Sequence, residues 1–490
     1  MNSRAFGATL AQSNADASSP AGTAADEIET QVGAIVARAR AAQRDFARGG
    51  QQTLDTAAAA AAWAIMAPAR NRQLAELAVH DTGLGNVDDK IQKNFRKTLG
   101  LLRDLHDRKT HGVIAEDARR GIVEIARPVG VVAAITPSTN PAATPANKIV
   151  NSLKCGNAVI VAPSPKGYGA CALLLRFIHA ELAKAGLSPD LVQMLPEPVT
   201  KAATAALMRQ ADLVVATGSQ ANVRMAYTSG TPAFGVGAGN VASIVSASAD
   251  LRDAAEKIAR SKTFDNATSC SSENSVVIDT VVYDAMLDAL RAAGGVLLDA
   301  SQKRALEATM WHDGKLSGRC TAKTADVIAQ LAGLDAVAAQ RPSFLMVEET
   351  GTGPAYPFSG EKLSPVLTVY RARDFNDAVA LVERIYAYMG AGHSVGLHGA
   401  DPAQAVHLGQ MLPVARVIVN QAHCFATGGN FDNGLPFSLS MGCGTWGKNN
   451  FTDNLGFRQY LNVTRVAYPI AAQVPEADDL LADYFARYGR

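Results

Sequence analysis

From residue 121 onward, short β-rich segments alternate with helical segments, and this alternation limits the fold more than any other feature of the chain. Asn157–Val161 is an apolar run of the kind found in strands buried on both faces, and a helical segment over residues 168–185 follows it. Leu191–Leu195 and Leu213–Ala216 are the next predicted strands, with another helix between them. Strand–helix–strand order of this kind predicts parallel sheets covered by helices, so the expected fold class is α/β.

A helical layer precedes these strands, and the alternation continues through the second half of the chain. The helices expected in the opening layer are Glu29–Phe46, Thr53–Ala67, Arg70–Asp81 and Asp88–Arg103. The later expected strands are Ala242–Val245, Ser275–Ile278, Phe344–Val347, Leu367–Tyr370, Ser394–Leu397, Val417–Val419 and Leu461–Val466. With 490 residues the chain is too long for one small core, so two or three domains are expected.

Charge and cysteine usage exclude several kinds of protein. The formal net charge is only +1, which leaves no basic field to hold nucleic acid. The six cysteines are widely spread without a Cys-x-x-Cys pair, which argues against a disulfide framework or a metal site. No apolar run reaches the roughly 18 residues needed to cross a membrane. Residues 1–26 lack the apolar centre of a signal peptide, so we expect a disordered extension on a cytoplasmic protein.

Cys270 is the strongest candidate for a reacting group. It lies in the small, polar, turn-prone stretch Thr263–Asn274, where hydroxyl and amide neighbours leave a sulfur accessible and hydrogen-bonded. The thiolate is the nucleophile of a reactive cysteine, and nearby amide donors lower the thiol pKa from its usual value of about 8.5. From this context alone, an ordinary loop cysteine is the competing interpretation.

Two turns are candidates for holding a phosphate-bearing cofactor. Thr217-Gly218-Ser219 follows the strand Leu213–Ala216 and opens a helix, an arrangement that presents free backbone N–H groups to a pyrophosphate. Gly235–Asn240 is rich in glycine, but its spacing differs from that of the dinucleotide-binding Gly-x-Gly-x-x-Gly motif. A tight turn between a helix and a strand explains that segment at least as well, so the Thr217 turn is the better candidate.

Together, five segments in this order resemble the signatures of the aldehyde dehydrogenase superfamily, and the similarity covers nearly the whole chain from about residue 30. The segments are Ile135–Pro141, Leu153–Val161, Thr217–Ser219, the stretch around Cys270 and Glu361–Val366. The resemblance implies a Rossmann-type cofactor domain, an α/β catalytic domain and a small β element for oligomerisation. It places the cofactor domain at 27–111 and 128–243, the catalytic domain at 244–445, and the oligomerisation element and tail at 112–127 and 446–490.

The same resemblance implies roles for individual residues. Cys270 would be the nucleophile, and either Asn140 or Thr139 would donate to the developing oxyanion. The residues expected to bind the nicotinamide cofactor are Thr136, Pro137, Ser164, Lys166, Thr217, Gly218, Ser219, Gly237 and Glu361. The superfamily also implies a homo-oligomer, either a dimer or a tetramer.

Departures from the superfamily pattern indicate its coenzyme A-acylating branch. Hydrolytic members carry Glu-Leu-Gly-Gly-Lys, whose glutamate activates water, and Gly235 falls at the glutamate position here. Without that base, coenzyme A can replace water as the attacking group, and Gly442–Gly447 also resembles the acylating enzymes. Where hydrolytic members often have a glutamate near the adenosine ribose this chain has Pro165, followed by Lys166. We therefore expect NADP rather than NAD, unless Lys166 is a solvated loop residue.

The substrate is expected to be a short aldehyde, because the sequence looks most like the acylating enzymes that act on sulfoacetaldehyde. Acetaldehyde or another short aldehyde is the main competitor. A sulfonate needs hydrogen-bond donors, and the candidates are Thr268, Ser269, His423 and Thr427. The sequence also allows a cysteine acyltransferase without a redox step, or a catalytically silent paralogue. The former requires a histidine base at the thiol, and no motif supplies one, although His393 is a candidate for the coenzyme A path or a packed histidine.

Overall fold

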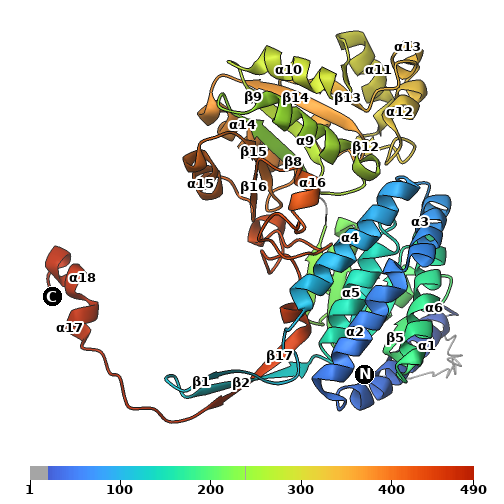
Figure 1. The fold of residues 1–490 in the computed structure, drawn as a ribbon, viewed down its shortest axis with the longest axis vertical. Coiled ribbons are helices and arrows are strands. Elements are labelled where there is room, and N and C mark those ends of the chain that lie inside the picture. Colours follow the sequence, from blue (N-terminus) through green and yellow to red (C-terminus); the bar gives the residue numbers. More distant parts are fainter. Residues whose placement is uncertain (1–19, 238) are drawn as a thin grey trace, which may run out of the picture.

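The structure, a computed structural model, describes residues 20–237 and 239–490. Figure 1 shows two α/β units, one above the other, and a thin arm that extends from the lower one. The extension expected over residues 1–26 lies outside the described residues up to residue 19. Helix α1 begins at Pro20, earlier than the expected start of ordered structure near Asp26.

Helices cover the first unit, as the apolar periodicity of the opening segments predicts. They are α1 (Pro20–Phe46), α2 (Gly50–Met66), α3 (Pro68–Thr82), α4 (Val87–Leu105), α5 (Ala143–Lys154), α6 (Tyr168–Lys184), α7 (Lys201–Gln210) and α8 (Gln220–Tyr227). Helix α2 is rich in alanine, and its small buried side chains let it pack against both α5 and α6. All of α5 is buried, and sequence reasoning missed it although Asn147, Lys148, Asn151 and Lys154 recur at helical spacing.

A five-stranded parallel sheet forms the centre of this unit. Its strands, in spatial order, are β5 (Val192–Met194), β4 (Ala158–Pro163), β3 (Val131–Thr136), β6 (Leu213–Thr217) and β7 (Ala233–Val236). The chain runs from β3 outward through β4 to β5 and then returns to add β6 and β7 on the other side. The strand order therefore reverses between β3 and β6, and ligands of such sheets bind at the carboxyl ends of the strands at this point.

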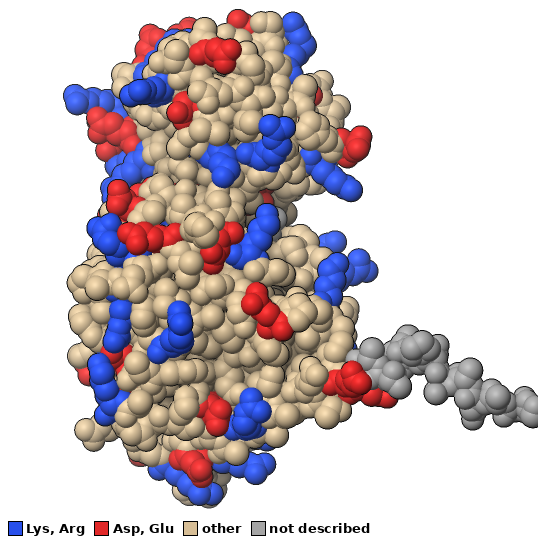
Figure 2. All heavy atoms as spheres, turned by 90° about the vertical axis from the view of Figure 1, so that its right-hand side faces the viewer, with Lys and Arg blue, Asp and Glu red and all other residues tan. Residues whose placement is uncertain are grey.

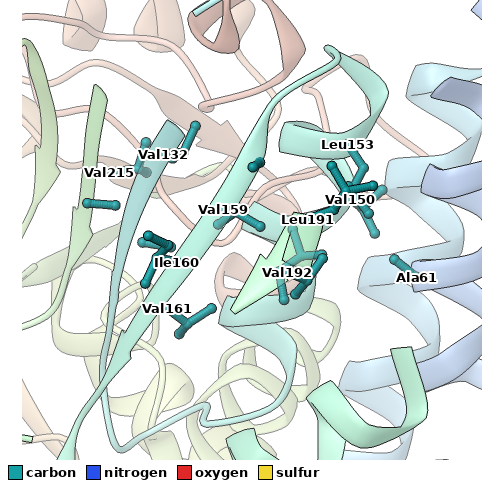
Figure 3. Close-up of a cluster of buried hydrophobic side chains, with 14 of the residues drawn as sticks. Ala61, Val132, Val150, Leu153, Val159, Ile160, Val161, Leu191, Val192 and Val215 are labelled. Carbon is teal, nitrogen blue, oxygen red and sulfur yellow. The ribbon is translucent and has the colours of Figure 1, made fainter. Parts of the chain in front are cut away.

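Buried aliphatic side chains hold this sheet to its helices. Figure 3 shows Val132, Ile160 and Val215 on the central strands, and the helical residues Val150 and Ala61 beside them. Strands β3 and β4 are buried along their whole length, which is why they appear in the sequence as continuous apolar runs.

A second, seven-stranded parallel sheet organises the other unit. Its spatial order is β10 (Gly295–Leu297), β13 (Phe344–Glu348), β14 (Val366–Ala372), β9 (Glu273–Asp279), β8 (Val241–Val245), β15 (Val395–His398) and β16 (Val417–Val419). Its helices are α9 (Leu251–Thr263), α10 (Tyr283–Ala292), α11 (Ala300–Met310), α12 (Ala325–Leu331), α13 (Asp335–Ala338), α14 (Phe375–Tyr388), α15 (Pro402–Met411) and α16 (His423–Ala426). A hairpin of β11 (Trp311–His312) and β12 (Lys315–Leu316) completes it. Because β8 pairs with β9 and β15, the chain changes sheets between β7 and β8, slightly before the expected boundary at residue 243.

The arm is a three-stranded antiparallel sheet of β1 (Gly112–Asp117), β2 (Ile122–Pro128) and β17 (Leu461–Ala467). Beyond it, the tail with α17 (Ala477–Leu480) and α18 (Ala482–Tyr488) stands apart from both units (Figure 1). The segment before β17 belongs elsewhere, because Leu455 and Tyr460 are part of the core of the first unit.

Acidic and basic side chains alternate over the face drawn in Figure 2, in keeping with the balanced composition. In the described part of the chain, no helix combines the length and apolar character needed to cross a bilayer.

Candidate active site

A cavity of about 310 Å³ lies where the carboxyl ends of β3 and β6 meet the loop that precedes β9. The predicted site residues that line it are Pro137, Thr139, Asn140, Thr217, Gly218, Ser219, Gly237, Cys270 and Glu361. The fold thus brings together residues from both sheets at the reversal point of the first one. The fold therefore places Cys270 in the same cavity as most of the cofactor-binding candidates.

Three predicted residues lie outside the cavity, at the same sheet edge. Thr136 is buried at the end of β3, and its hydroxyl has no hydrogen-bond partner. Ser164 follows β4, its N–H donates to the Thr136 carbonyl (3.1 Å), and its hydroxyl also lacks a partner. Lys166 is exposed in the 3₁₀ turn Pro165–Gly167. Ser164 and Lys166 thus follow β4, the strand next to β3, at the same edge of the sheet as the cavity.

The loop that carries Cys270 is shaped by an unusual turn after α9. Asp265, Asn266 and Ala267 have φ values of 50°, 51° and 58°, a left-handed run that costs about 1–2 kcal/mol per non-glycine residue. Buried contacts hold the turn, because the Asp265 carboxylate accepts hydrogen bonds from Lys90 (3.1 Å) and Lys93 (2.5 Å). The helix therefore ends abruptly, and the chain turns Cys270 toward the cavity.

His393, a candidate for the coenzyme A path or a packed histidine from the sequence, faces the Cys270 sulfur. His393 Nε2 lies 3.5 Å from Cys270 Sγ, and its Nδ1 lies 2.7 Å from the Ser394 hydroxyl. Burial, with the nearby Arg416 charge, lowers the pKa of His393 to about 3. Burial, with the Glu361 charge, raises the pKa of Cys270 to about 12. The site therefore holds a neutral thiol beside a neutral imidazole, and the imidazole can accept the thiol proton only as the sulfur becomes more acidic on bonding to carbon.

Asn140 is oriented by a buried lysine. Lys93 Nζ donates to Asn140 Oδ1 (2.9 Å), and it also contacts Asp265 and the Thr268 hydroxyl (3.1 Å). Because the amide oxygen faces Lys93, the amide Nδ2 is left to point elsewhere. Thr139 also lines the cavity, but only its carbonyl is held, by Lys90 Nζ at 3.1 Å.

Glu361 is another side chain that lines the cavity. Its Oε1 accepts from the Gly239 N–H (3.4 Å), and burial raises its pKa to about 8. Gly239 is tightly enclosed, since a Cβ there would lie 2.5 Å from the Cys270 carbonyl oxygen and 3.0 Å from His393. Among the described lining residues, Glu361 is the one carboxylate.

Gly235, which falls at the glutamate position of the hydrolytic members, does not face the sulfur. Gly235 lies within β7, and a Cβ there would meet Val223 and Tyr227 of the helix behind it. A side chain at that position would face α8 and not the cavity. The close approach to Cys270 is made by Gly239.

Helix α4 contributes a group of cations that sequence reasoning missed. Lys93, Arg96 and Lys97 line the cavity, together with Phe264 and Cys424. Lys90, Lys93 and Lys97 are separated by three and four residues, which puts them on one face of α4. A helix face made of lysines is normally exposed to solvent. Only the packing of α4 against the second unit shows that this face is buried.

Two of the expected sulfonate donors do not line the cavity. The Thr427 hydroxyl lies 2.9 Å from His423 Nδ1, which also lies 2.9 Å from the Ser271 carbonyl oxygen. Both side chains are buried and held by these contacts, although His423 Nε2 has no hydrogen-bond partner. Thr268 and Ser269 do line the cavity, although Thr268 is already bonded to Lys93 and Asp265.

The edge formed by β3, β4 and β6 fits a dinucleotide. Ser219 caps the start of α8 by accepting from Asn222 N (3.3 Å), so the free N–H groups of the first turn face the reversal point. The unpartnered hydroxyls of Thr136 and Ser164 are orphaned buried donors of the kind that a ligand satisfies.

Comparisons with known proteins agree with this arrangement. Residues 5–298 match the model of the aldehyde dehydrogenase family. The chain is 75% identical over 459 residues to a sulfoacetaldehyde dehydrogenase (acylating) of Cupriavidus necator, covering 94% of this chain and 93% of that protein. It is 39% identical to the enzyme of the same name from Bilophila wadsworthia, covering 93% of this chain and 98% of that one.

A solved structure shows the same fold. An acetylating aldehyde dehydrogenase from Geobacillus thermoglucosidasius superposes with a TM-score of 0.88 at 33% identity, covering 92% of this chain and 99% of that one. With the family match and these relatives, the predicted fold class is confirmed. The chain belongs to the aldehyde dehydrogenase family, in its acylating branch.

Proposed function

We propose that this protein oxidises sulfoacetaldehyde with NADP or NAD and transfers the acyl group to coenzyme A through a Cys270 thioester. The observation that carries the proposal is the Cys270 sulfur facing His393 Nε2 at 3.5 Å, in a cavity whose other edge fits a dinucleotide. The identity of 75% to an acylating sulfoacetaldehyde dehydrogenase supports the substrate.

His393 and Asn140 have separate tasks in the first step. As the Cys270 sulfur bonds to the aldehyde carbon, its proton passes to the neutral His393 imidazole. The Cys270 N–H and Asn140 Nδ2 then donate to the oxygen that becomes negative. Donors fixed in advance stabilise such an oxygen, and removing one typically lowers the rate about 100-fold or more. Lys93 supports this step by holding the amide oxygen of Asn140 (2.9 Å).

Glu361, Thr217, Gly218 and Ser219 would hold the nicotinamide cofactor, with Thr136, Pro137, Ser164, Lys166 and Gly237 along the same edge. The bound cofactor supplies the hydride acceptor. Lys166 is an exposed cation next to Ser164, so it is available to pair with a 2′-phosphate, which favours NADP. Because Pro165 stands where a glutamate would repel that phosphate, nothing at this position opposes it.

Release to coenzyme A, rather than to water, depends on what stands near the sulfur. Among the described lining residues, Glu361 is the one carboxylate that could activate water, and its pKa of about 8 keeps it largely protonated at neutral pH. A protonated carboxyl cannot act as a general base. A thiol nucleophile therefore has the advantage in the second step.

The test follows reduced cofactor after mixing enzyme, sulfoacetaldehyde and NADP without coenzyme A. We expect one equivalent of reduced cofactor per site and then a stall, because the thioester persists, and coenzyme A should restore turnover. Cys270→Ser should abolish the burst, whereas the matched control Cys320→Ser, in a separate core of the second unit, should keep it. Sustained acid formation without coenzyme A would show that Glu361 activates water after all.

A non-redox acyltransferase remains the competing function, and the position of His393 removes one objection to it. Such an acyltransferase uses Cys270 and coenzyme A but needs neither Glu361 nor the Thr217 turn. The burst of reduced cofactor separates the two functions, because an acyltransferase would produce none.

We also propose that the protein is a cytoplasmic homo-oligomer, a dimer or tetramer, assembled through the arm. Its six cysteines are all unpaired thiols, which suits a reducing compartment. The tail beyond β17 exposes Ile470, Val474, Leu480 and Tyr484, apolar side chains that a neighbouring copy would cover.

A further inference from the structure

We propose that Arg96 and Lys97 hold the sulfonate of the substrate, so that the cavity selects short aldehydes carrying a negative charge two bonds from the reacting carbon. This inference rests on the proposed function, whose cysteine chemistry by itself would act on any short aldehyde. It adds that a specific pair of residues on α4 recognises the negative charge of the substrate.

Lys97 is a buried cation with an unused donor. Its side chain lines the cavity, and the residue is only 6% exposed. Its Nζ donates to the carbonyls of Gly428 (2.7 Å) and Gly429 (3.2 Å) and lies 5.3 Å from the centre of the Phe437 ring, so in its charged form one of its three N–H groups has no hydrogen-bond acceptor. In the described residues no carboxylate lies within ion-pair distance of it, and both acceptors are neutral.

Arg96 repeats this pattern one residue earlier. Its Nη1 donates to Asn430 Oδ1 (2.8 Å), while its buried Nε has no hydrogen-bond partner. The guanidinium lies 4.7 Å above the ring of Phe425, and the Arg260 guanidinium lies 4.4 Å from the same ring. A fixed, flat guanidinium with a free N–H is suited to an oxyanion with several acceptor oxygens.

The donors of the other lysines of α4 are already engaged. Lys93 and Lys90 share the Asp265 carboxylate, and each makes a second bond to the Thr139–Asn140 segment. Arg96 and Lys97 are therefore the cations of the cavity with capacity for a ligand.

The surroundings of the pair contain few groups that favour its charged form. Cys424 and Asp432 favour the charged form of Arg96, and Cys424 and Asp104 favour that of Lys97, but Asp104 is already paired with Arg103 (2.8 Å). Arg260 opposes protonation of Arg96, and Arg96 and Lys93 oppose protonation of Lys97. Buried charges without partners are costly, and a permanently ionised sulfonate offsets that cost whereas an uncharged aldehyde cannot.

Binding should also be coupled to a proton. Burial holds the pKa of Lys97 well below its usual value, so before an anion binds the amine has a reduced tendency to carry a proton. A bound anion raises this pKa again because it favours the charged form. Sulfonate binding is therefore accompanied by proton uptake.

The experiment compares two aldehydes across three variants. For Lys97→Met and Arg96→Gln we expect kcat/KM for sulfoacetaldehyde to fall on the order of 100-fold, while kcat/KM for uncharged propionaldehyde changes by less than about threefold. The matched control is Arg72→Gln, which removes an exposed cation of α3 outside the cavity lining and should leave the ratio of the two substrates unchanged. Equal losses on both aldehydes, or an unchanged ratio, would overturn the inference.

A binding measurement separates this inference from the proposed function. The probe is 2-hydroxyethanesulfonate, which lacks the aldehyde and so requires no catalysis. Calorimetry on the wild-type protein in buffers of different ionisation enthalpy should show binding with proton uptake, and both variants should lose that binding. Absence of binding to the wild-type protein would refute the sulfonate site, whereas absence of a cofactor burst with either aldehyde would refute the proposed function.

Discussion

The geometry of Asn140 makes a sharp prediction about the oxyanion. Replacing Asn140 with Ala removes the Nδ2 donor, and the loss of one such donor lowers kcat about 100- to 1000-fold, or about 2.7–4 kcal/mol. Thr139→Val should cost far less, because the structure holds the Asn140 amide and only the main chain of Thr139.

Lys93 should act through the same amide. Its bond to Asn140 Oδ1 is 2.9 Å long, and hydrogen bonds to charged groups are worth about 1.5–3 kcal/mol. Lys93→Met should therefore lower kcat roughly 10- to 100-fold. In an Asn140→Ala background the same change should cost less than about twofold, because the group that it positions is already absent.

The assay is the single-turnover rate of cofactor reduction, which follows formation of the oxyanion and precedes release. Thermal unfolding of each variant checks that the fold persists, since Lys93→Met leaves Asp265 paired with Lys90 alone (3.1 Å). The reasoning is refuted if Thr139→Val is the more damaging change, or if the effects of Asn140→Ala and Lys93→Met simply multiply.

Three further outcomes are expected. Glu361 has a folded-state pKa of about 8 against 4.5 for an unperturbed carboxyl. Between these pH values the folded protein binds more protons than the unfolded chain, so its stability falls as pH rises. Glu361→Gln should therefore raise the melting temperature by a margin that grows from about pH 4.5 to 8, while weakening cofactor binding. Lys166→Glu should lower the NADP to NAD ratio of kcat/KM about tenfold, and equal losses on both cofactors would point to a structural role instead. Deleting residues 469–490 should lower the oligomeric mass seen by light scattering without abolishing the thioester burst, because no residue of the tail lines the cavity and the tail stands apart from both units (Figure 1).

The sequence by itself determined the fold class and most of the strands. The apolar runs now seen as β3 and β4 are unmistakable because both faces of these strands are buried. Ordered motifs around Pro137, Thr217, Cys270 and Glu361 likewise sufficed to predict a shared site, and all four residues line one cavity. Such signals are local in the sequence, so they can be recognised without knowledge of the tertiary contacts.

Tertiary structure alone decided which distant groups surround the sulfur. His393 lies 123 positions from Cys270 in the sequence, and nothing local marks it as the partner of the thiol. The lysines of α4 have the spacing of a solvated face, and only packing against the second unit turns that face into a cavity wall. Charge and proton affinity depend on burial and on neighbours through space, and a linear sequence does not contain those distances.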